Sequence, residues 1–291
     1  MSDFFKSNFS VNKSDEIKLS DETFFRLRDT IYKLSGIYFN ESKKYLLESR
    51  ILKRIQVLKL DAFESYLQKI SALNGREELK NLFDVITINE TYFFRAEFQI
   101  EALESHIIPE LVAAKLSSNN NKIRIWSAAC STGEEPYTIS MVIDNNIKAK
   151  YPEIKFEIFA SDLSQEVIKN AEKGLYNEYS IRNLPKDYFI KYFTRVKDKF
   201  EIDESIRNMV EFKNINLYDS FSINQLEKFD VIFCENVLIY FDPVSKEKVI
   251  TNLYNAFNDG GYLFIGTAES LHNVKQNFDL IHFPKAMAYR R

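Results

Sequence analysis

Hydrophobic residues are spaced differently in the first third of the chain and in the remainder. Up to about residue 95, apolar positions recur at helical spacing, which predicts an all-helical segment. Ser20 precedes the first apolar-periodic stretch as a cap residue, and Asp61 followed by Glu64 has the spacing of a helix start. Four helices are expected: one after Ser20, one at about 41–58, one from Asp61 and one at about 76–86.

Beyond a polar loop at 117–121, short apolar strands alternate with amphipathic helices. Strands are expected at 123–128, 156–160, 229–234 and 262–266, and helices at 97–116, 135–147, 164–172 and 244–257. This alternation predicts an α/β fold with a doubly wound, mostly parallel sheet and helices on both of its faces.

The alternation breaks down between 177 and 212, where Phe200–Ile202 and Val210–Phe212 predict a small antiparallel β insertion. We therefore expect a helical domain over 1–86, a linker over 87–96 and an α/β domain over 97–291 that contains the insertion. A chain of 291 residues is long enough for both domains to bury cores.

Composition narrows the possible surroundings and partners. A net charge of −3 gives the whole molecule no attraction for nucleic acid or anionic membranes. Two cysteines, Cys130 and Cys234, exclude a disulfide framework and suit a reducing compartment. Met1–Lys6 lacks the apolar core of a signal peptide, and no stretch approaches the ~18 apolar residues of a membrane span. We expect a cytoplasmic protein without membrane insertion.

One face of the predicted helix at 41–58 is basic. Its apolar residues Leu47, Ile51, Ile55 and Leu58 fall on one arc, and a neighbouring arc holds Lys43, Arg50, Lys53 and Arg54. These four cations, the basic strip, have two interpretations. They are either solvated side chains beside a core-facing stripe or a surface that docks an acidic partner.

Unusual residues follow the predicted strands at their carboxyl ends, where doubly wound sheets bind ligands. After the first strand, Gly133 permits close backbone approach, whereas Glu134 and Glu135 would repel a phosphate. A cationic, hydroxyl-bearing or amino-acid-bearing ligand fits this loop better. Asp162 ends the second strand, where a carboxylate either accepts ribose hydroxyls or caps the next helix. Asn236 and Tyr240 follow the strand at 229–234.

The three histidines, His106, His272 and His282, form no cluster in the sequence, which argues against a metal site. A DNA amino-methyltransferase is disfavoured, because the strand at 229–234 is not followed by an Asn/Asp-Pro-Pro-aromatic tetrapeptide.

Five segments together resemble the CheR family, the chemoreceptor glutamate O-methyltransferases of bacterial chemotaxis, in the expected order over nearly the whole chain. They are Asn-Glu-Thr-Tyr-Phe-Phe-Arg at 89–95, Trp-Ser-Ala-Ala-Cys-Ser-Thr-Gly-Glu-Glu-Pro-Tyr at 126–137, Ala-Ser-Asp-Leu at 160–163, Asn-Val-Leu-Ile-Tyr-Phe at 236–241 and Gly-Thr-Ala-Glu-Ser at 266–270. The resemblance implies an S-adenosylmethionine methyltransferase fold of class I, with S-adenosylhomocysteine as product.

The resemblance also implies roles for individual residues. Cofactor-binding positions would be Asn89, Thr91, Arg95, Glu134, Glu135, Asp162, Asn216, Leu217, Glu235 and Asn236. Asp162 would hold the ribose, Asn216 and Leu217 would flank the adenine, and Glu134 or Glu135 would take the amino-acid end. Arg95 and Tyr240 would be the catalytic positions.

The implied partner is the helical cytoplasmic region of chemoreceptors, recognised by the helical domain through the basic strip. In some members of the family the β insertion also grips a peptide at the receptor's C-terminus. A monomer is expected. A glutamate acceptor, with a pKa of ~4.3, is ionised at pH 7 and needs no general base. Catalysis would then rest on positioning and on removing water from the carboxylate.

Glu235 departs from the family, which usually has arginine at this position. Either Glu235 turns away from the acceptor and pairs with Arg95, or the acceptor is not anionic; the paired arrangement is favoured because the other motif residues are in place. Two alternatives stay open: a methyltransferase that acts on another protein or a small molecule, and a non-catalytic signalling protein that binds the cofactor.

Overall fold

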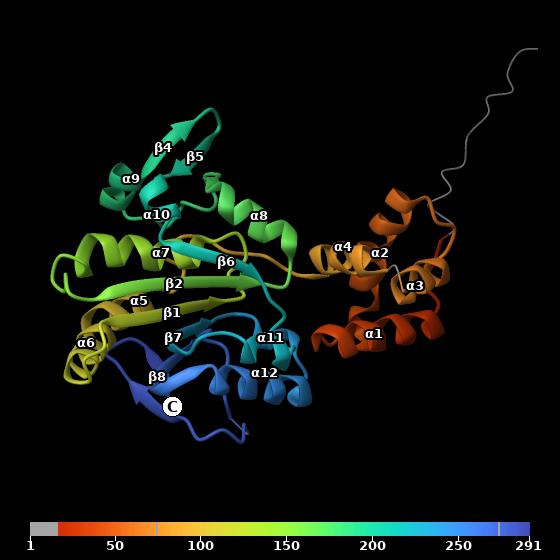
Figure 1. Cartoon of the computed structure of the whole chain (residues 1–291). Helices are drawn as coiled ribbons and strands as arrows, with labels where there is room; N and C mark the ends of the chain where they lie inside the picture. The colour runs from red at the N-terminus through yellow and green to blue at the C-terminus, as the bar shows by residue number, and fades with distance from the viewer. Residues whose placement is uncertain (1–16, 74, 273) are drawn as a thin grey trace, which may run out of the picture. The chain divides into compact units, whose positions relative to one another are not determined.

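A computed structural model describes residues 17–73, 75–272 and 274–291 (Figure 1). Met1–Lys6, which the sequence analysis found to lack the apolar core of a signal peptide, lies outside the described residues. The described residues form two compact units: a helical unit, which takes in Phe39–Ile86 and the described residues up to Thr30, and an α/β unit of Ile31–Tyr38 and Thr87–Arg291. In the described ranges, no helix has both the length and the apolar character needed to cross a membrane.

The helical unit contains the four helices that periodicity predicts. They are α1 (Asp21–Ser35, the last turn of which groups with the α/β unit), α2 (Lys44–Leu58, preceded by the 3₁₀ turn η2, Glu41–Lys43), α3 (Phe63–Ser71) and α4 (Arg76–Ile86). Ser20 caps α1, because its Oγ accepts the Thr23 amide at 3.1 Å. The predicted cap at Asp61 is wrong: Ala62 is the N-cap residue of α3, and Asp61 accepts the Ser65 hydroxyl instead.

The large sheet of the α/β unit has the strand order β6-β2-β1-β7-β8-β10-β9. Its strands are β1 (Lys122–Ala128), β2 (Lys155–Asp162), β6 (Val210–Asn214), β7 (Phe229–Cys234), β8 (Phe257–Ile265), β9 (Asp279–His282) and β10 (Met287–Arg290). The first five strands in that order run parallel, and β10 is antiparallel to both of its neighbours. The predicted doubly wound, mostly parallel sheet is therefore confirmed.

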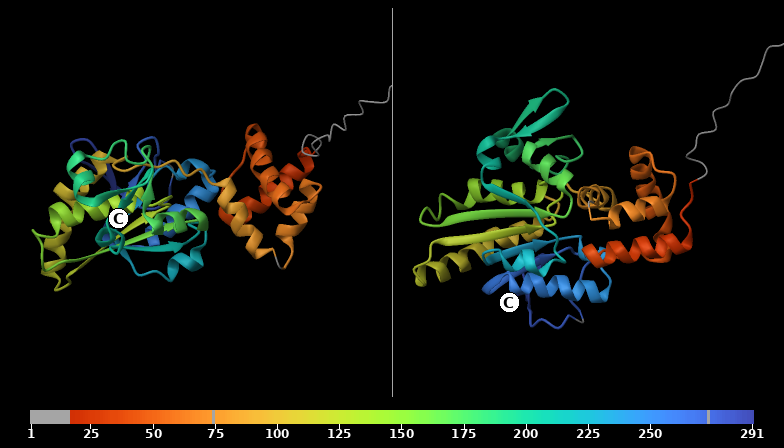
Figure 2. Two further views of the ribbon diagram at one scale, coloured as in Figure 1. Left: turned by 90° about the horizontal axis from the view of Figure 1, so that it is seen from above. Right: turned by 45° about the vertical axis from the view of Figure 1, so that its right-hand side comes forward.

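Helices cover both faces of this sheet, as two further directions of view also show (Figure 2). One face carries α5 (Glu97–Ala102), the π-helical turn η3 (Leu103–Ile107), α6 (Ile108–Ser117), α7 (Glu134–Val142), the π-helical turn η4 (Ile143–Ile147) and α8 (Gln165–Lys173). The other carries α11 (Ser220–Asn224) and α12 (Pro243–Asn255).

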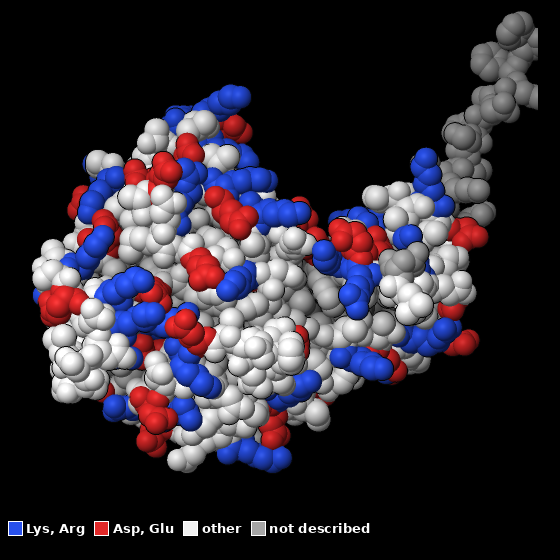
Figure 3. All heavy atoms as spheres, in the orientation of Figure 1, with Lys and Arg blue, Asp and Glu red and all other residues white. Residues whose placement is uncertain are grey.

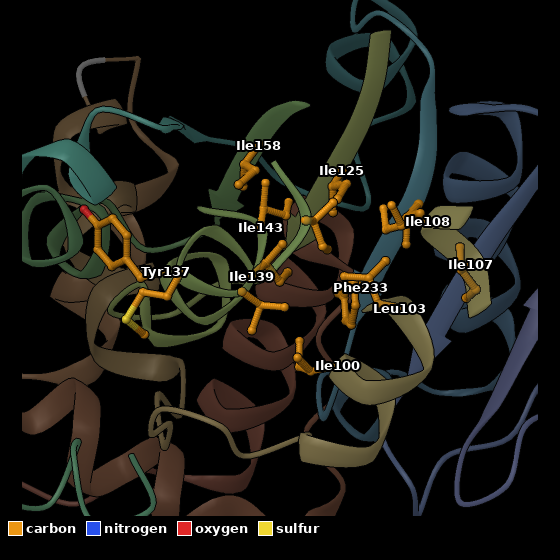
Figure 4. Packing of buried hydrophobic residues seen from close by; sticks show 14 of the residues in the cluster. Ile100, Leu103, Ile107, Ile108, Ile125, Tyr137, Ile139, Ile143, Ile158 and Phe233 are labelled. Atoms are coloured by element: carbon orange, nitrogen blue, oxygen red, sulfur yellow. The ribbon is translucent and has the colours of Figure 1, made fainter. Parts of the chain in front are cut away.

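Strand β1 shows how the sequence supplies both cores, since successive side chains of a strand point to opposite faces. Ile125 packs with Leu103 and Ile139 on the first face (Figure 4). Trp126, the next residue, packs on the second face with its ring centroid 5.0 Å from that of Phe229. Because β1 is buried on both faces, its carboxyl end is held firmly from both sides.

The small insertion contains a three-stranded antiparallel sheet of order β3-β5-β4, with two short helices (Figure 1). Its elements are β3 (Leu175–Tyr176), α9 (Lys186–Tyr192), β4 (Phe193–Val196), β5 (Lys199–Ile202) and α10 (Glu204–Arg207). The prediction for Phe200–Ile202 is confirmed, but that for Val210–Phe212 is wrong. These residues lie in β6, parallel to β2, where the Phe212 ring meets Tyr137 of α7 edge-on at 5.5 Å.

Candidate active site at the strand ends

The loop between β1 and α7 has an unusual backbone. Ala129, Ser131 and Gly133 all have positive φ, at 67°, 50° and 92°. For non-glycine residues this conformation costs about 1–2 kcal/mol each, and such strain gathers at functional sites. A Cβ at Gly133 would lie 2.8 Å from the Cβ of Ala171, so glycine is required for the loop to approach α8.

Asp162, the last residue of β2, fastens this loop. Its Oδ2 accepts the Ser131 amide at 2.9 Å, and its Oδ1 accepts the Ser164 amide at 2.9 Å. The cap of α8 is Ser164 rather than Asp162, because the Ser164 hydroxyl accepts the Val167 amide. A carboxylate has about four acceptor positions, so two amide contacts do not by themselves exclude ribose hydroxyls.

Glu134 and Glu135 begin α7 and have different surroundings. Glu134 is 1% exposed, and its Oε2 accepts the Thr132 hydroxyl at 2.7 Å. Burial raises its pKa, against hydrogen bonds from Thr132 and Ser180. Glu135 accepts the Ser127 hydroxyl at 2.6 Å, and burial raises its pKa to about 7 although Ser127 and Arg95 oppose the rise.

Glu269 links the carboxyl ends of β7 and β8, a role that sequence patterns did not reveal. Its Oε2 accepts the amides of Asn236 at 2.9 Å and Gly266 at 2.7 Å. Asn236 adopts a left-handed conformation with φ of 60°, and a Cβ at Gly266 would come within 2.9 Å of its amide nitrogen. Two strand ends are thereby locked together beside the loop that follows β1.

Glu235 does not pair with Arg95, so the favoured arrangement is wrong. The Arg95 guanidinium donates to the Glu90 carbonyl oxygen at 2.7 Å and lies 5.8 Å from the Tyr92 ring centre. Glu235 is half-buried, and its Oε1 has no hydrogen-bond partner among the described residues. Sequence adjacency of motifs did not fix the direction of either side chain.

The segment at 89–95 is anchored to the strand-end loop through its backbone. The Asn89 carbonyl oxygen accepts the Ser131 hydroxyl at 3.2 Å, and the Phe94 amide donates to Thr138 of α7 at 3.2 Å. Phe93 is fully buried against Tyr176. Thr91, between these anchors, is half-buried. The structure thus brings this segment beside the end of β1.

The remaining predicted positions follow β6 and β7. Asn216 donates to the Leu34 carbonyl oxygen at 2.7 Å and accepts the Tyr218 amide. Leu217 is buried. Tyr240 ends the 3₁₀ turn η5 (Leu238–Tyr240), and its carbonyl oxygen accepts the Tyr38 amide at 2.9 Å.

Comparison with known proteins identifies both parts of the chain. Residues 22–87 match the family description "CheR methyltransferase, all-alpha domain", and residues 89–287 match "CheR methyltransferase, SAM binding domain". The chain belongs to the CheR methyltransferase family.

Relatives match this CheR family member over nearly their whole length. A chemotaxis protein methyltransferase of Borreliella burgdorferi is 39% identical over 93% of this chain and 94% of its own. Chemotaxis protein methyltransferase 2 of Vibrio cholerae is 35% identical, with 94% of each chain covered. A magnesium protoporphyrin IX methyltransferase structure with bound S-adenosylmethionine matches over 76% of this chain and 96% of its own, at 12% identity and a TM-score of 0.33. This identity and TM-score are too low to add to the assignment.

This CheR family member is therefore an S-adenosylmethionine-dependent methyltransferase of chemotaxis, and the predicted family, enzyme class and cofactor are confirmed. The strand-end residues fit that cofactor. Gly133 gives the close backbone approach, Asp162 supplies a carboxylate for hydroxyl groups, and Glu235 presents a buried acceptor atom without a partner. When bound, the cofactor supplies an activated methyl group on its sulfonium.

The basic strip lies in the helical unit, and two of its four cations are used inside that unit. Arg54 forms two hydrogen bonds of 2.8 Å with the buried Glu78, and Arg50 donates to the Ile86 carbonyl oxygen. Lys53 is exposed and Lys43 is half-exposed. On the face in view, basic and acidic side chains are intermingled rather than sorted into one basic field (Figure 3).

Proposed function

We propose that this CheR family member transfers the methyl group of S-adenosylmethionine to glutamate side chains in the helical cytoplasmic region of chemoreceptors. The products are glutamate methyl esters and S-adenosylhomocysteine. The observation that carries the proposal is the strand-end site of a CheR fold, in which Asp162 ends β2, Glu135 lies at the start of α7 after β1, and Asn236 follows β7. We infer that the enzyme works in the cytoplasm as a monomer.

In this proposal the cofactor lies across the ends of β2, β1 and β7. Asp162 accepts ribose hydroxyls while its amide contacts hold the loop at Ser131 in place. Asn216 and Leu217 flank the adenine after β6. Glu135, rather than Glu134, takes the amino-acid end, because Glu134 is 1% exposed and turns toward Thr132.

The protein's remaining task is to position an acceptor that is already ionised. A glutamate carboxylate at pH 7 needs no base, so orientation and exclusion of water provide the rate enhancement. Arg95 is exposed and near enough to lower the pKa of Glu135, so we assign it to neutralising a carboxylate in the site. We assign Tyr240, after β7, to orienting the acceptor. Asn89 and Thr91 would complete the wall beside Arg95.

Receptor recognition in this proposal depends on the lysines of the basic strip. Since Arg50 and Arg54 already have partners inside the helical unit, Lys43 and Lys53 are the cations offered to an acidic receptor helix. The insertion offers a second surface. Among the strands that the structure describes, β4 pairs only with β5, so its other edge could accept a receptor C-terminal peptide as an added strand.

The test of function is transfer of a radiolabelled methyl group from S-adenosylmethionine to membranes that carry chemoreceptors. We expect label on the receptor that is released by mild base, as methyl esters are. A receptor with its cytoplasmic glutamates replaced by alanine is the control and should stay unlabelled. Base-stable label, or equal label on the control receptor, would refute glutamate methylation.

The test of recognition compares the Lys43→Gln/Lys53→Gln double variant with Lys69→Gln, an exposed lysine on α3 of the same unit. We expect the double variant to raise KM for the receptor severalfold, with unchanged affinity for S-adenosylhomocysteine. Methylation should also weaken between about 50 and 300 mM salt, because exposed charges are screened. If the double variant has the same KM for the receptor as Lys69→Gln, the basic strip does not contribute to receptor recognition.

A further inference from the structure

Three carboxyl groups from three elements surround the end of β7. Glu135 begins α7, Glu235 follows β7 and Glu269 follows β8. Glu269 is occupied, because its two oxygens accept the amides of Asn236, Gly266 and Ile239. Glu135 accepts the Ser127 hydroxyl. Of these three carboxyl groups, only Glu235 has an oxygen, Oε1, that is sealed from solvent without a hydrogen-bond partner among the described residues.

A buried carboxylate without a partner is costly, and a second carboxylate nearby increases the cost. Burial raises the pKa of Glu235 well above its usual range, and the charges of Glu135 and Glu269 raise it further. Arg95, the cation that opposes this rise, is held by the Glu90 carbonyl oxygen and forms no ion pair with Glu235 in the described chain. The charge of Glu135 therefore disfavours the ionised form of Glu235, and carboxyl groups that interact in this way lose their protons as a pair.

We propose that Glu135 and Glu235 form a carboxyl pair that holds one proton in the free enzyme and receives a cationic centre of S-adenosylmethionine, which expels that proton to solvent. The inference rests on the proposed placement of the cofactor at the strand ends. The cation is either the α-ammonium or the sulfonium; both would give the unpartnered Glu235 oxygen the positive charge that the protein does not supply.

The negative charges around the Oε1 atom of Glu235 disfavour binding of an anionic group at this position. An ionised Glu235 adds to the negative field of Glu135 and Glu269, and this field would repel a carboxylate placed here. A buried hydrogen-bond acceptor beside a second carboxylate instead selects a cation or a donor. Glu235 would thus be a specificity residue for the charged cofactor rather than a contact for the receptor glutamate.

The direction of the pH dependence follows from the pair's proton. Below the pH at which the pair loses this proton, the cofactor must displace it, so affinity rises with pH by up to about tenfold per pH unit. Above that pH the affinity becomes constant. The groups that face the pair are Glu269 after β8, Arg95 of the segment at 89–95, Ser127 of β1, and the buried thiols of Cys130 and Cys234. Of these groups, Glu269 is the other carboxyl, and it is fixed by backbone amides.

The experiment is calorimetric titration at pH 7.5, just above the pKa of about 7 of Glu135, in two buffers with different ionisation enthalpies. We expect the wild type to release about one proton per ligand bound, and Glu235→Gln to release less than half as much. The matched control is Glu101→Gln, an exposed glutamate on α5, which should behave as the wild type. The pH dependence of wild-type affinity gives the same information without a variant.

Parallel titrations with S-adenosylmethionine and S-adenosylhomocysteine locate the cation, because the product retains the ammonium but lacks the sulfonium. Proton release with both ligands assigns the ammonium to the pair, and release with S-adenosylmethionine alone assigns the sulfonium. Binding to the wild type without proton release, or release of the same number of protons by Glu235→Gln as by the wild type, would refute the proposed carboxyl pair. Absence of binding to the wild type would instead refute the placement of the cofactor.

Discussion

Replacing Arg54 by methionine tests whether the basic strip includes a structural ion pair. The Arg54 Nε and Nη2 atoms each lie 2.8 Å from an oxygen of Glu78, whose side chain is 6% exposed. Tyr66 and Asn81 also donate to this carboxylate. Arg54→Met would leave a buried carboxylate without its counter-charge.

The expected loss of stability is about 3 kcal/mol, the lower end of the range for breaking a buried pair, because the Arg54 side chain is 17% exposed. With an m-value of ~2 kcal/mol/M, this loss lowers the urea midpoint by about 1.5 M. Lys53→Met, on the same helix but exposed, should change stability by less than ~0.5 kcal/mol.

The effect of Arg54 on stability also depends on pH. Burial tends to raise the pKa of Glu78, but hydrogen bonds from Arg54 and Tyr66 outweigh burial and hold the pKa below 4.5. The stabilisation is therefore present above about pH 4.5, and it is lost as the pH falls through the lowered pKa. The difference between the two variants should shrink in acid.

The two units can be followed separately in one urea titration. Trp126 is the only tryptophan and lies in β1, so its fluorescence reports on the α/β unit, whereas far-ultraviolet circular dichroism also reports on the helical unit. We expect Arg54→Met to add an early transition in circular dichroism while the Trp126 midpoint stays unchanged. Coincident unfolding curves for Arg54→Met and Lys53→Met would refute the structural role of Arg54. Arg54 would then again be a candidate for receptor binding.

Three further substitutions test the strand-end site. Asp162→Ala should weaken S-adenosylhomocysteine binding at least tenfold and lower stability by about 1–3 kcal/mol, because two buried amides lose their acceptor; unchanged calorimetric affinity in the folded variant would contradict the ribose assignment. Gly133→Ala should lower the free energy of unfolding by at least ~1 kcal/mol, because its Cβ would meet Ala171; an unaltered Tm would show that the loop can yield. Glu235→Gln should stabilise the ligand-free protein at pH 8 but hardly at pH 4, because a carboxyl with a raised pKa loses stability as pH rises; thermal melts equally shifted at both pH values would exclude this cause.

Elements with a strong local period could be predicted from the sequence alone. Three residues of the predicted stripe in α2, Leu47, Ile51 and Ile55, are completely buried, and the fourth, Leu58, is half-buried at the end of the helix. Helix α4 has the bounds that periodicity gave. In each case the local pattern alone determines the outcome.

Features that depend on a distant partner could not be predicted from the local sequence. Val210–Phe212 has a pattern that fits either sheet, and the choice is made by the pairing with β2 and the contact with Tyr137. Arg54 is bound by Glu78, 24 residues away, which no helical spacing within 41–58 reveals. Likewise, the charge environment of Glu235 includes Glu135 and Glu269, which lie far from it in the sequence.

The order of strands in the large sheet also has a consequence for synthesis. Strand β10 lies between β8 and β9, although it is made after both of them. Until Met287–Arg290 leaves the ribosome, β8 exposes an edge of unpaired backbone groups and β9 has no neighbour in the sheet. The helical unit, made earlier, contains no such late-arriving strand in its described residues and can fold during translation. The nascent chain therefore passes through a stage in which a folded helical unit precedes an aggregation-prone sheet edge, and this is the stage at which chaperones would be needed.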